Sequence, residues 1–162
     1  MRTGLSIAIA LAAGALSAPV HAQSSAGVTL DELAAAMGEH TSGVNRNNND
    51  DGDVFFTGDM TGTDGDTYGI VAVPRDCTGA VPRCSVVTIY ANFSWGDVDH
   101  ATLAKLIDYN DTKVRGRAYA FGDSVGVDYQ VFLGDGAGES YLSARIGEFG
   151  GVLADFVSHM KQ

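Results

Sequence analysis

The chain has 162 residues, a formal net charge of −10 at pH 7 and 45% apolar side chains. A chain of this length fits one domain more comfortably than two. The excess of carboxylates disfavours nucleic acid and anionic membrane surfaces as partners, since binding to either depends on Lys and Arg side chains.

Residues 1–22 have the pattern of a secretory signal peptide. Arg2 provides a positive start, residues 5–16 form an apolar run, and the stretch ends at Ala22 in the small-residue pattern of a cleavage site. We therefore predict cleavage after Ala22 and a periplasmic location. The leader carries no Cys at the cleavage point, and no later segment approaches the roughly 20 apolar residues of a membrane span. We accordingly expect no membrane anchor.

The rest of the chain is expected to have a flexible start over residues 23–27 and a single domain over residues 28–162. A helix should open this domain, because Thr29 is a good N-cap and Glu32 follows three residues later, which is the spacing of a capping box. Apolar residues then recur at helical spacing until Gly38, a typical helix stop.

Asn and Asp dominate residues 41–53, so we expect a solvated acidic loop there, because these side chains favour turns. The alternative for this loop is a calcium site. Asn47, Asn49 and Asp51 fit positions 1, 3 and 5 of an EF-hand loop, but Gly58 stands where position 12 requires Glu. The pattern therefore favours the solvated loop over a specific calcium site.

Three strands should follow the loop. Residues 54–61 and 67–73 predict a hairpin around the turn at residues 63–65. Residues 85–93 predict a third strand that is apolar on both faces, and we place it in the interior of the sheet.

The two cysteines, Cys77 and Cys84, lie between the second and third predicted strands. An even number of cysteines in an exported chain predicts a disulfide. A Gly and a Pro between them let the chain turn back, so we expect this pair to be bonded.

The second half of the chain begins with a second helix, which Asp97 or Asp99 caps and which ends near Asn110. Its apolar side should be formed by Leu103, Leu106 and Ile107. Residues 114–121 and 125–133 then predict another hairpin. The second strand of this hairpin alternates apolar and polar residues, which indicates one buried and one wet face.

The final helix carries apolar residues in steps of three and four along its whole length. These residues are Leu142, Ile146, Phe149, Leu153, Phe156 and Met160. The expected order of elements is therefore α-β-β-β-α-β-β-α. Five strands joined mainly by hairpins predict an α+β fold, with a mainly antiparallel sheet and helices packed on one face.

We find no residue pattern that predicts a catalytic, cofactor or metal site. The histidines after the leader, His40, His100 and His159, are not spaced as metal ligands, and each lies at a predicted helix end or loop edge. The glycine-rich residues 134–138 lack the G-x-G-x-x-G spacing of a nucleotide site. We therefore expect no cofactor and no enzymatic activity.

One region has the character of a partner surface. It joins the end of the second helix to the following strand and contains Tyr109, Asn110, Arg115, Arg117 and Tyr119. Its arginines stand out in a chain that is short of cations. The alternative interpretation is structural: Asn110 caps the helix end, and the arginines pair with local carboxylates such as Asp108 or Asp111.

The sequence also resembles the YbjN domain family in an exported form, over nearly all of residues 28–160. The resemblance is carried by residues 29–33, residues 51–53, the pair Cys77 and Cys84, residues 107–110 and residues 114–119. It implies a fold similar to that of type III secretion chaperones and no catalytic residues. Members of the family are tied to regulation, stress tolerance and protein interaction.

The functional expectation is therefore a non-enzymatic periplasmic domain for protein interaction or regulation. Its partner would be another protein or a second copy of the chain. The alternative is a small periplasmic ligand-binding protein or hydrolase, with a site between Asn110, Arg117 and the Asn/Asp-rich loop.

Overall fold

A computed structural model of the chain describes residues 26–134 and 136–162. The predicted signal peptide over residues 1–22 lies outside the described residues, as do residues 23–25. The elements in chain order are α1 (Leu30–Gly38), β1 (Thr41–Asn48), β2 (Val54–Thr61), β3 (Thr67–Thr78), β4 (Arg83–Ser94), α2 (His100–Thr112), β5 (Arg117–Phe121), β6 (Ser124–Phe132) and α3 (Glu139–Met160). In this part of the chain, no helix is both long and apolar enough to cross a membrane.

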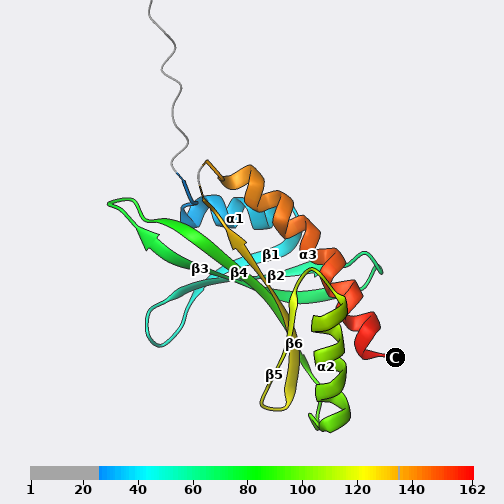
Figure 1. Cartoon of the computed structure of the whole chain (residues 1–162). Coiled ribbons are helices and arrows are strands. Elements are labelled where there is room, and N and C mark those ends of the chain that lie inside the picture. The colour runs from blue at the N-terminus through cyan, green and yellow to red at the C-terminus, as the bar shows by residue number, and fades with distance from the viewer. Residues whose placement is uncertain (1–25, 135) are drawn as a thin grey trace, which may run out of the picture.

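The strands form one sheet in the order β1-β2-β3-β4-β6-β5, and every neighbouring pair is antiparallel. The described helices α1, α2 and α3 lie on the same side of this sheet (Figure 1). The α+β class and the placement of the helices are therefore confirmed. The interior position expected for residues 85–93 is also confirmed, because β4 lies between β3 and β6.

The prediction of five strands was wrong, because residues 41–48 form the strand β1 and not a loop. Asn45 and Asn47 lie opposite Thr57 and Phe55 of β2, so backbone pairing with β2 defines this strand. β1 is an edge strand and Val44 is its only apolar residue. Hydropathy therefore gives no strand signal, and the order of elements is α-β-β-β-β-α-β-β-α.

The predicted disulfide is confirmed, and Cys77 and Cys84 lie on paired strands. β3 and β4 both extend farther than the sequence indicated, so the two cysteines are direct cross-strand neighbours near the tip of their hairpin. Cys84 is fully buried. Its backbone N–H and C=O also pair with Val28, which fixes the start of the domain against β4.

Reduction of this disulfide is expected to lower the free energy of unfolding by about 2 kcal/mol without unfolding the domain. The loss is modest because only seven positions separate the cysteines and most of the core lies away from the hairpin tip. Urea unfolding with and without reductant measures the loss. Mass measurement after alkylation of the unfolded, non-reduced protein tests the bond, and two alkylated thiols would contradict it.

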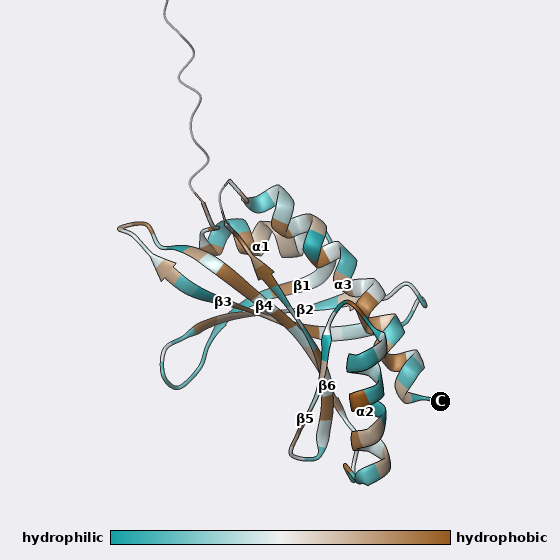
Figure 2. Ribbon diagram, in the orientation of Figure 1, coloured by the Kyte–Doolittle hydropathy of each residue, from teal (hydrophilic) through white to brown (hydrophobic). Residues whose placement is uncertain are grey.

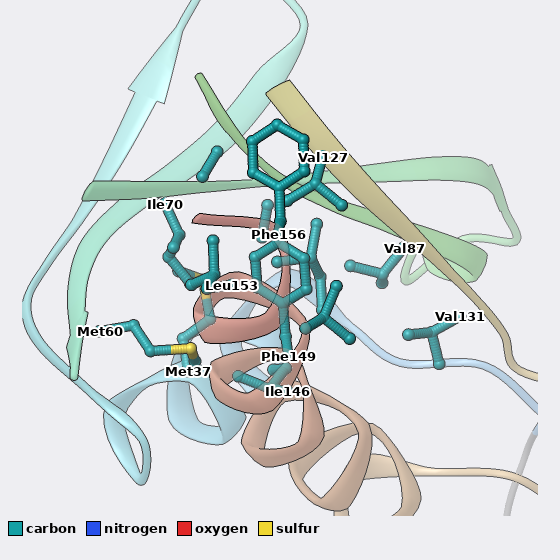
Figure 3. Close-up of a cluster of buried hydrophobic side chains, with 14 of the residues drawn as sticks. Met37, Met60, Ile70, Val87, Val127, Val131, Ile146, Phe149, Leu153 and Phe156 are labelled. Carbon is teal, nitrogen blue, oxygen red and sulfur yellow. The ribbon is translucent and has the colours of Figure 1, made fainter. Parts of the chain in front are cut away.

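The core lies between the helices and the sheet, and the apolar stripe of α3 fills its centre. Figure 2 shows hydrophobic residues along β4 and β6, the central strands of the sheet. Figure 3 shows the side chains of α3 pointing from the helix toward the strands that carry Val87, Val127 and Val131. All six residues of the predicted stripe are buried. The prediction for the final helix is therefore confirmed.

The predicted apolar side of the second helix was only partly right. Asp99 is the N-cap of α2, and Leu106 is buried, but Leu103 is 42% and Ile107 is 62% exposed. The buried face instead contains Thr102 and Tyr109 beside Leu106. The apolar pattern indicated the other side, because Leu103 and Ile107 are more apolar than Thr102 and Tyr109, which are buried instead.

The capping box of α1 is present as predicted. The Glu32 N–H donates to Thr29 Oγ1 at 3.2 Å, and the Thr29 N–H donates to Glu32 Oε2 at 2.7 Å. Arg83 at the start of β4 forms a 2.9 Å ion pair with the same Glu32 carboxylate. The hydrogen bond from the Thr29 N–H holds the pKa of Glu32 below its usual value of 4.5, and the Arg83 guanidinium lowers this pKa further. This carboxylate therefore couples α1 to the sheet.

Glu32→Gln is expected to make the stability of the domain less sensitive to acid. Because the pKa of Glu32 is lowered in the folded state, its carboxylate stabilises the fold above the unfolded pKa. This contribution is lost as the pH falls through the folded pKa. Urea unfolding of the parent and the variant between about pH 7 and about pH 3 measures the difference. Asp31→Asn, on an exposed neighbour, is the control, and parallel curves for parent and Glu32→Gln would contradict the expectation.

Candidate functional site

One face of the sheet is not covered by any helix among the described residues, and we call it the helix-free face. Its side chains alternate along the strands with those of the core. One row crosses five strands in register and contains Thr57, Val71, Tyr90, Asp128 and Arg117. Tyr90 stands in the middle of this row, on the central strand β4. The helix-free face therefore presents an aromatic centre, with Val71 on one side and the Asp128 and Arg117 side chains on the other.

Arg117 and Asp128 form a two-bond ion pair at one end of this row. Arg117 Nε donates to Asp128 Oδ1 at 3.2 Å, and an Arg117 terminal nitrogen contacts Asp128 Oδ2. The Asp128 side chain is 11% exposed, whereas the Arg117 side chain is 68% exposed. The bond to Asp128 raises the pKa of Arg117. The pair thus neutralises a nearly buried carboxylate and leaves the guanidinium accessible on the helix-free face.

Tyr119 lies in the next row of the same face, opposite Gly126 of β6. Its hydroxyl donates to Asn92 Oδ1 at 2.6 Å. A Cβ atom at Gly126 would stand 2.6 Å from the Tyr119 ring, so the ring occupies the space that a side chain on β6 would fill. Burial raises the pKa of Tyr119 to about 12. Its phenol therefore stays protonated at neutral pH and remains a hydrogen-bond donor.

Two large apolar side chains on this face are open to solvent. Phe121 at the end of β5 is 78% exposed, and Phe132 at the end of β6 is 65% exposed. Their cross-strand partners, Ser124 and Val86, place them on the same face as Tyr119 and Asp128. Exposed phenylalanines beside Tyr and Arg are the composition of a protein contact surface more than of a solvated sheet face.

The residues of the predicted partner surface are separated by the sheet. Arg117 and Tyr119 lie on the helix-free face, whereas Tyr109 is fully buried on the helix side. The Tyr109 hydroxyl contacts the Arg115 carbonyl oxygen at 3.4 Å, so Tyr109 supports the helix end and is not accessible to a partner. Arg115 pairs with Glu148 of α3 at 3.4 Å. The sequence placed these residues together because they are neighbours in the chain.

Asn110 binds the outer edge of β5. Its Nδ2 donates to the Ala118 carbonyl oxygen at 3.0 Å, and its Oδ1 accepts from the Ala118 N–H at 2.7 Å. These are the two backbone groups that an added strand would use on this edge. Asn110 therefore closes the β5 edge of the sheet, a role that differs from the predicted helix cap.

A hollow of about 750 Å³ opens at the margin of the helix-free face, between the tips of the β1–β2 and β3–β4 hairpins. We call it the hairpin cleft. Phe55, Val73 and Tyr90 line it from the helix-free face, and Asp53 and Asp76 line it at the hairpin tips. Asp76 has a φ of 52°, which is unusual for a residue other than Gly and is often found at binding sites. Neither Asn110 nor Arg117 lines this hollow.

The histidines and carboxylates do not form a recognisable catalytic set among the described residues. Ser143 Oγ lies 2.9 Å from His40 Nε2 and also contacts a Glu39 carboxylate oxygen. The carboxylate binds the serine and not the imidazole, so this group lacks the order of a nucleophilic triad. Within residues 26–134 and 136–162, no group of three or more His, Cys, Asp or Glu is placed to hold a metal ion.

The sequence was also compared with known proteins. No protein-family model and no curated protein sequence matches the chain.

Proposed function

We propose that this chain is an exported, non-enzymatic domain that binds another protein through the helix-free face. The observation that carries the proposal is the composition of that face. Tyr90 lies at its centre, Arg117 and Tyr119 lie on its edge strand β5, and Phe121 and Phe132 are exposed at two of its strand ends. Tyr and Arg are the residue types that most often dominate binding energy in protein interfaces.

Two further features support this assignment. The leader pattern of residues 1–22 and the bond between Cys77 and Cys84 fit a periplasmic protein, since disulfides persist in oxidising compartments. Helices on one face of an antiparallel sheet fit the resemblance to the YbjN domain and to the fold of type III secretion chaperones. β1 adds one strand to the order that this resemblance led us to expect.

Capture of partners from a periplasmic extract tests the proposal. The tagged protein should retain a protein that the variant carrying Phe121→Ala and Phe132→Ala does not retain. Ile107→Ala is the matched control, because Ile107 is 62% exposed, close to the 65% of Phe132, but lies on α2. Loss of capture with Ile107→Ala and not with the two Phe substitutions would contradict the proposal, as would capture that no face variant changes.

A second copy of the chain is one form that the partner could take. Sedimentation of the parent and of the variant carrying Phe121→Ala and Phe132→Ala distinguishes this form. A dimer that the two substitutions dissociate would identify the partner as a second copy. A strict monomer at high protein concentration would leave a different protein as the partner.

The hairpin cleft favours a second candidate function, the binding of a small molecule. Its volume of about 750 Å³ lies within the roughly 300–1,000 Å³ of known ligand sites. A compound that raises the melting temperature of the parent, but not of Val73→Ala, would support this function. If the same compound stabilises both proteins equally, it binds outside the cleft.

A further inference from the structure

The hairpin cleft exists because β2 and β3 separate. Their pairing ends at Phe56 and Ala72. Beyond that point β2 pairs only with β1, down to Asn48 and Val54, while β3 pairs only with β4, out to the disulfide and Thr78. The two hairpin tips therefore diverge from a common sheet, as Figure 1 shows at the side of the sheet away from α2.

Both walls of the cleft are held in place by local bonds. In the β1–β2 tip, the Asp53 N–H donates to Asn49 Oδ1 at 2.8 Å, and the Gly52 N–H donates to the Asn49 carbonyl oxygen at 3.0 Å. In the β3–β4 tip, the disulfide joins the strands. The Asn/Asp-rich run and the cysteine pair thus brace opposite walls of one cleft. A preformed cleft loses less entropy when it binds a ligand.

The apolar part of the cleft lining comes from both faces of the sheet. Leu30 and Val54 line it from the helix side, and Phe55, Val73 and Tyr90 line it from the helix-free face. The hollow therefore crosses the margin of the sheet and does not end in a closed chamber. An elongated ligand can lie between the hairpins and contact both faces at once.

The charged groups of the cleft are mainly carboxylates. Asp53 and Asp76 line opposite tips, and Asp50 and Asp51 stand in the same turn as Asp53. Arg75 is the cation in the lining. The whole chain has a formal charge of −10, so the long-range field also attracts cations. The complementary ligand has apolar groups with positive charges beside them.

We infer that the hairpin cleft binds an extended peptide segment of the partner, in which apolar side chains alternate with Lys or Arg. The apolar side chains contact Phe55, Val73 and Tyr90, and the cations face Asp53 and Asp76. Pro74 in the wall has no backbone N–H, so side chains and not a full strand ladder provide the recognition. This inference rests on the proposed function, because it names the segment with which the partner enters.

Titration of isotope-labelled protein with two synthetic peptides, followed by NMR, tests the inference. In one peptide Leu alternates with Lys, and in the other Leu alternates with Glu. The Lys peptide should shift the amide signals of residues 53–55 and 73–77, and it should bind more weakly as salt is added. The Glu peptide should leave these signals unchanged. Equal binding of both peptides, or no binding of either, would overturn the inference.

Two valine variants, one inside and one outside the cleft, test whether the Lys peptide binds in the cleft. Val73→Ala should weaken the Lys peptide about three- to tenfold, because it removes apolar contact area. Val71→Ala should leave the affinity unchanged, since Val71 lies on the same strand and face, is also half-buried and does not line the cleft. Equal losses in the two valine variants would overturn the inference.

Charge variants provide a second test that does not alter the apolar lining. Asp53→Asn combined with Asp76→Asn should weaken the Lys peptide about three- to tenfold at low salt. Asp59→Asn combined with Asp66→Asn removes the same charge outside the cleft and should have little effect. An equal loss in the two double variants would mean that net charge, and not the cleft, attracts the peptide, and would overturn the inference.

The remaining outcomes separate this inference from the proposed function. If the cleft signals shift with protein concentration alone, a second copy occupies the cleft and the inference is overturned. If a captured partner depends on Phe121 and Phe132 while the Lys peptide leaves the cleft unchanged, the inference fails and the proposed function stands. If capture of the partner does not depend on Phe121 and Phe132, and the Lys peptide does not depend on Val73, Asp53 and Asp76, both the inference and the proposed function fail.

Discussion

Phe156→Ala is expected to lower the free energy of unfolding by about 3–5 kcal/mol, and Phe149→Ala by a similar amount. Phe156 is almost fully buried and contacts two further rings, with centroid distances of 5.7 Å to Phe93 and 5.4 Å to Tyr109. Phe149 is fully buried and stacks on Tyr129. Each truncation leaves a cavity where α3 meets its neighbours, and such a loss is a large part of the stability of a domain of this size.

Urea unfolding of the two variants measures these losses. Ser158→Ala is the control, because Ser158 is exposed on the same helix and its truncation removes no core contact. Arg145 is a poorer control, since it forms a 2.8 Å ion pair with Glu148 and lies over the Tyr141 ring. If the two Phe variants have the same free energy of unfolding as the parent, α3 is not part of the core.

Asn110→Ala is expected to lower the free energy of unfolding by about 1–3 kcal/mol and to promote self-association. The substitution removes both bonds to the Ala118 backbone and leaves those two polar groups without their partner. It also exposes the edge of β5 as a template for strand pairing between molecules. Urea unfolding measures the stability, and light scattering over a range of protein concentrations measures the association.

Asp111→Ala serves as the comparison for Asn110→Ala. Asp111 is the next residue in α2 and is also exposed, so its replacement tests the helix end without opening the edge of the sheet. We expect Asp111→Ala to remain as monomeric as the parent. If both variants associate equally, the helix end and not the β5 edge controls association.

The parts of the fold that could be predicted are those with local signals. The capping box at Thr29 marked the start of α1, and the stripe from Leu142 to Met160 marked α3. β1 could not be predicted, because its pairing with β2 depends on backbone bonds and on polar residues that also favour turns. The long ends of β3 and β4 were missed for a similar reason, since the disulfide and the strand register hold residues that look like a loop.

The candidate site was less accessible to sequence reasoning than the fold. Arg117 was singled out because cations are scarce in the chain, and Tyr119 because it follows closely in the sequence; both lie on the helix-free face. Their partners there, Asp128 and Asn92, come from other strands. The sequence carries no local sign that β2 and β3 separate, so the hairpin cleft could not be foreseen. The one available signal was the alternation in β6, which places Asp128 and Gln130 opposite its core residues.

The position of α1 has a consequence for how the chain folds. α1 packs against α3 and β1, and Glu39 at its end contacts Ser143, which lies 104 positions later in the chain. The residues before α1 also depend on distant partners, since the Gly27 N–H donates to the Ala137 carbonyl oxygen at 3.3 Å. Contacts between such distant parts of a chain form slowly. α1, the first of the described helices to be synthesised, is therefore among the last to find its native neighbours. Until α3 has been synthesised, the apolar side of α1 lacks the native contacts that cover it.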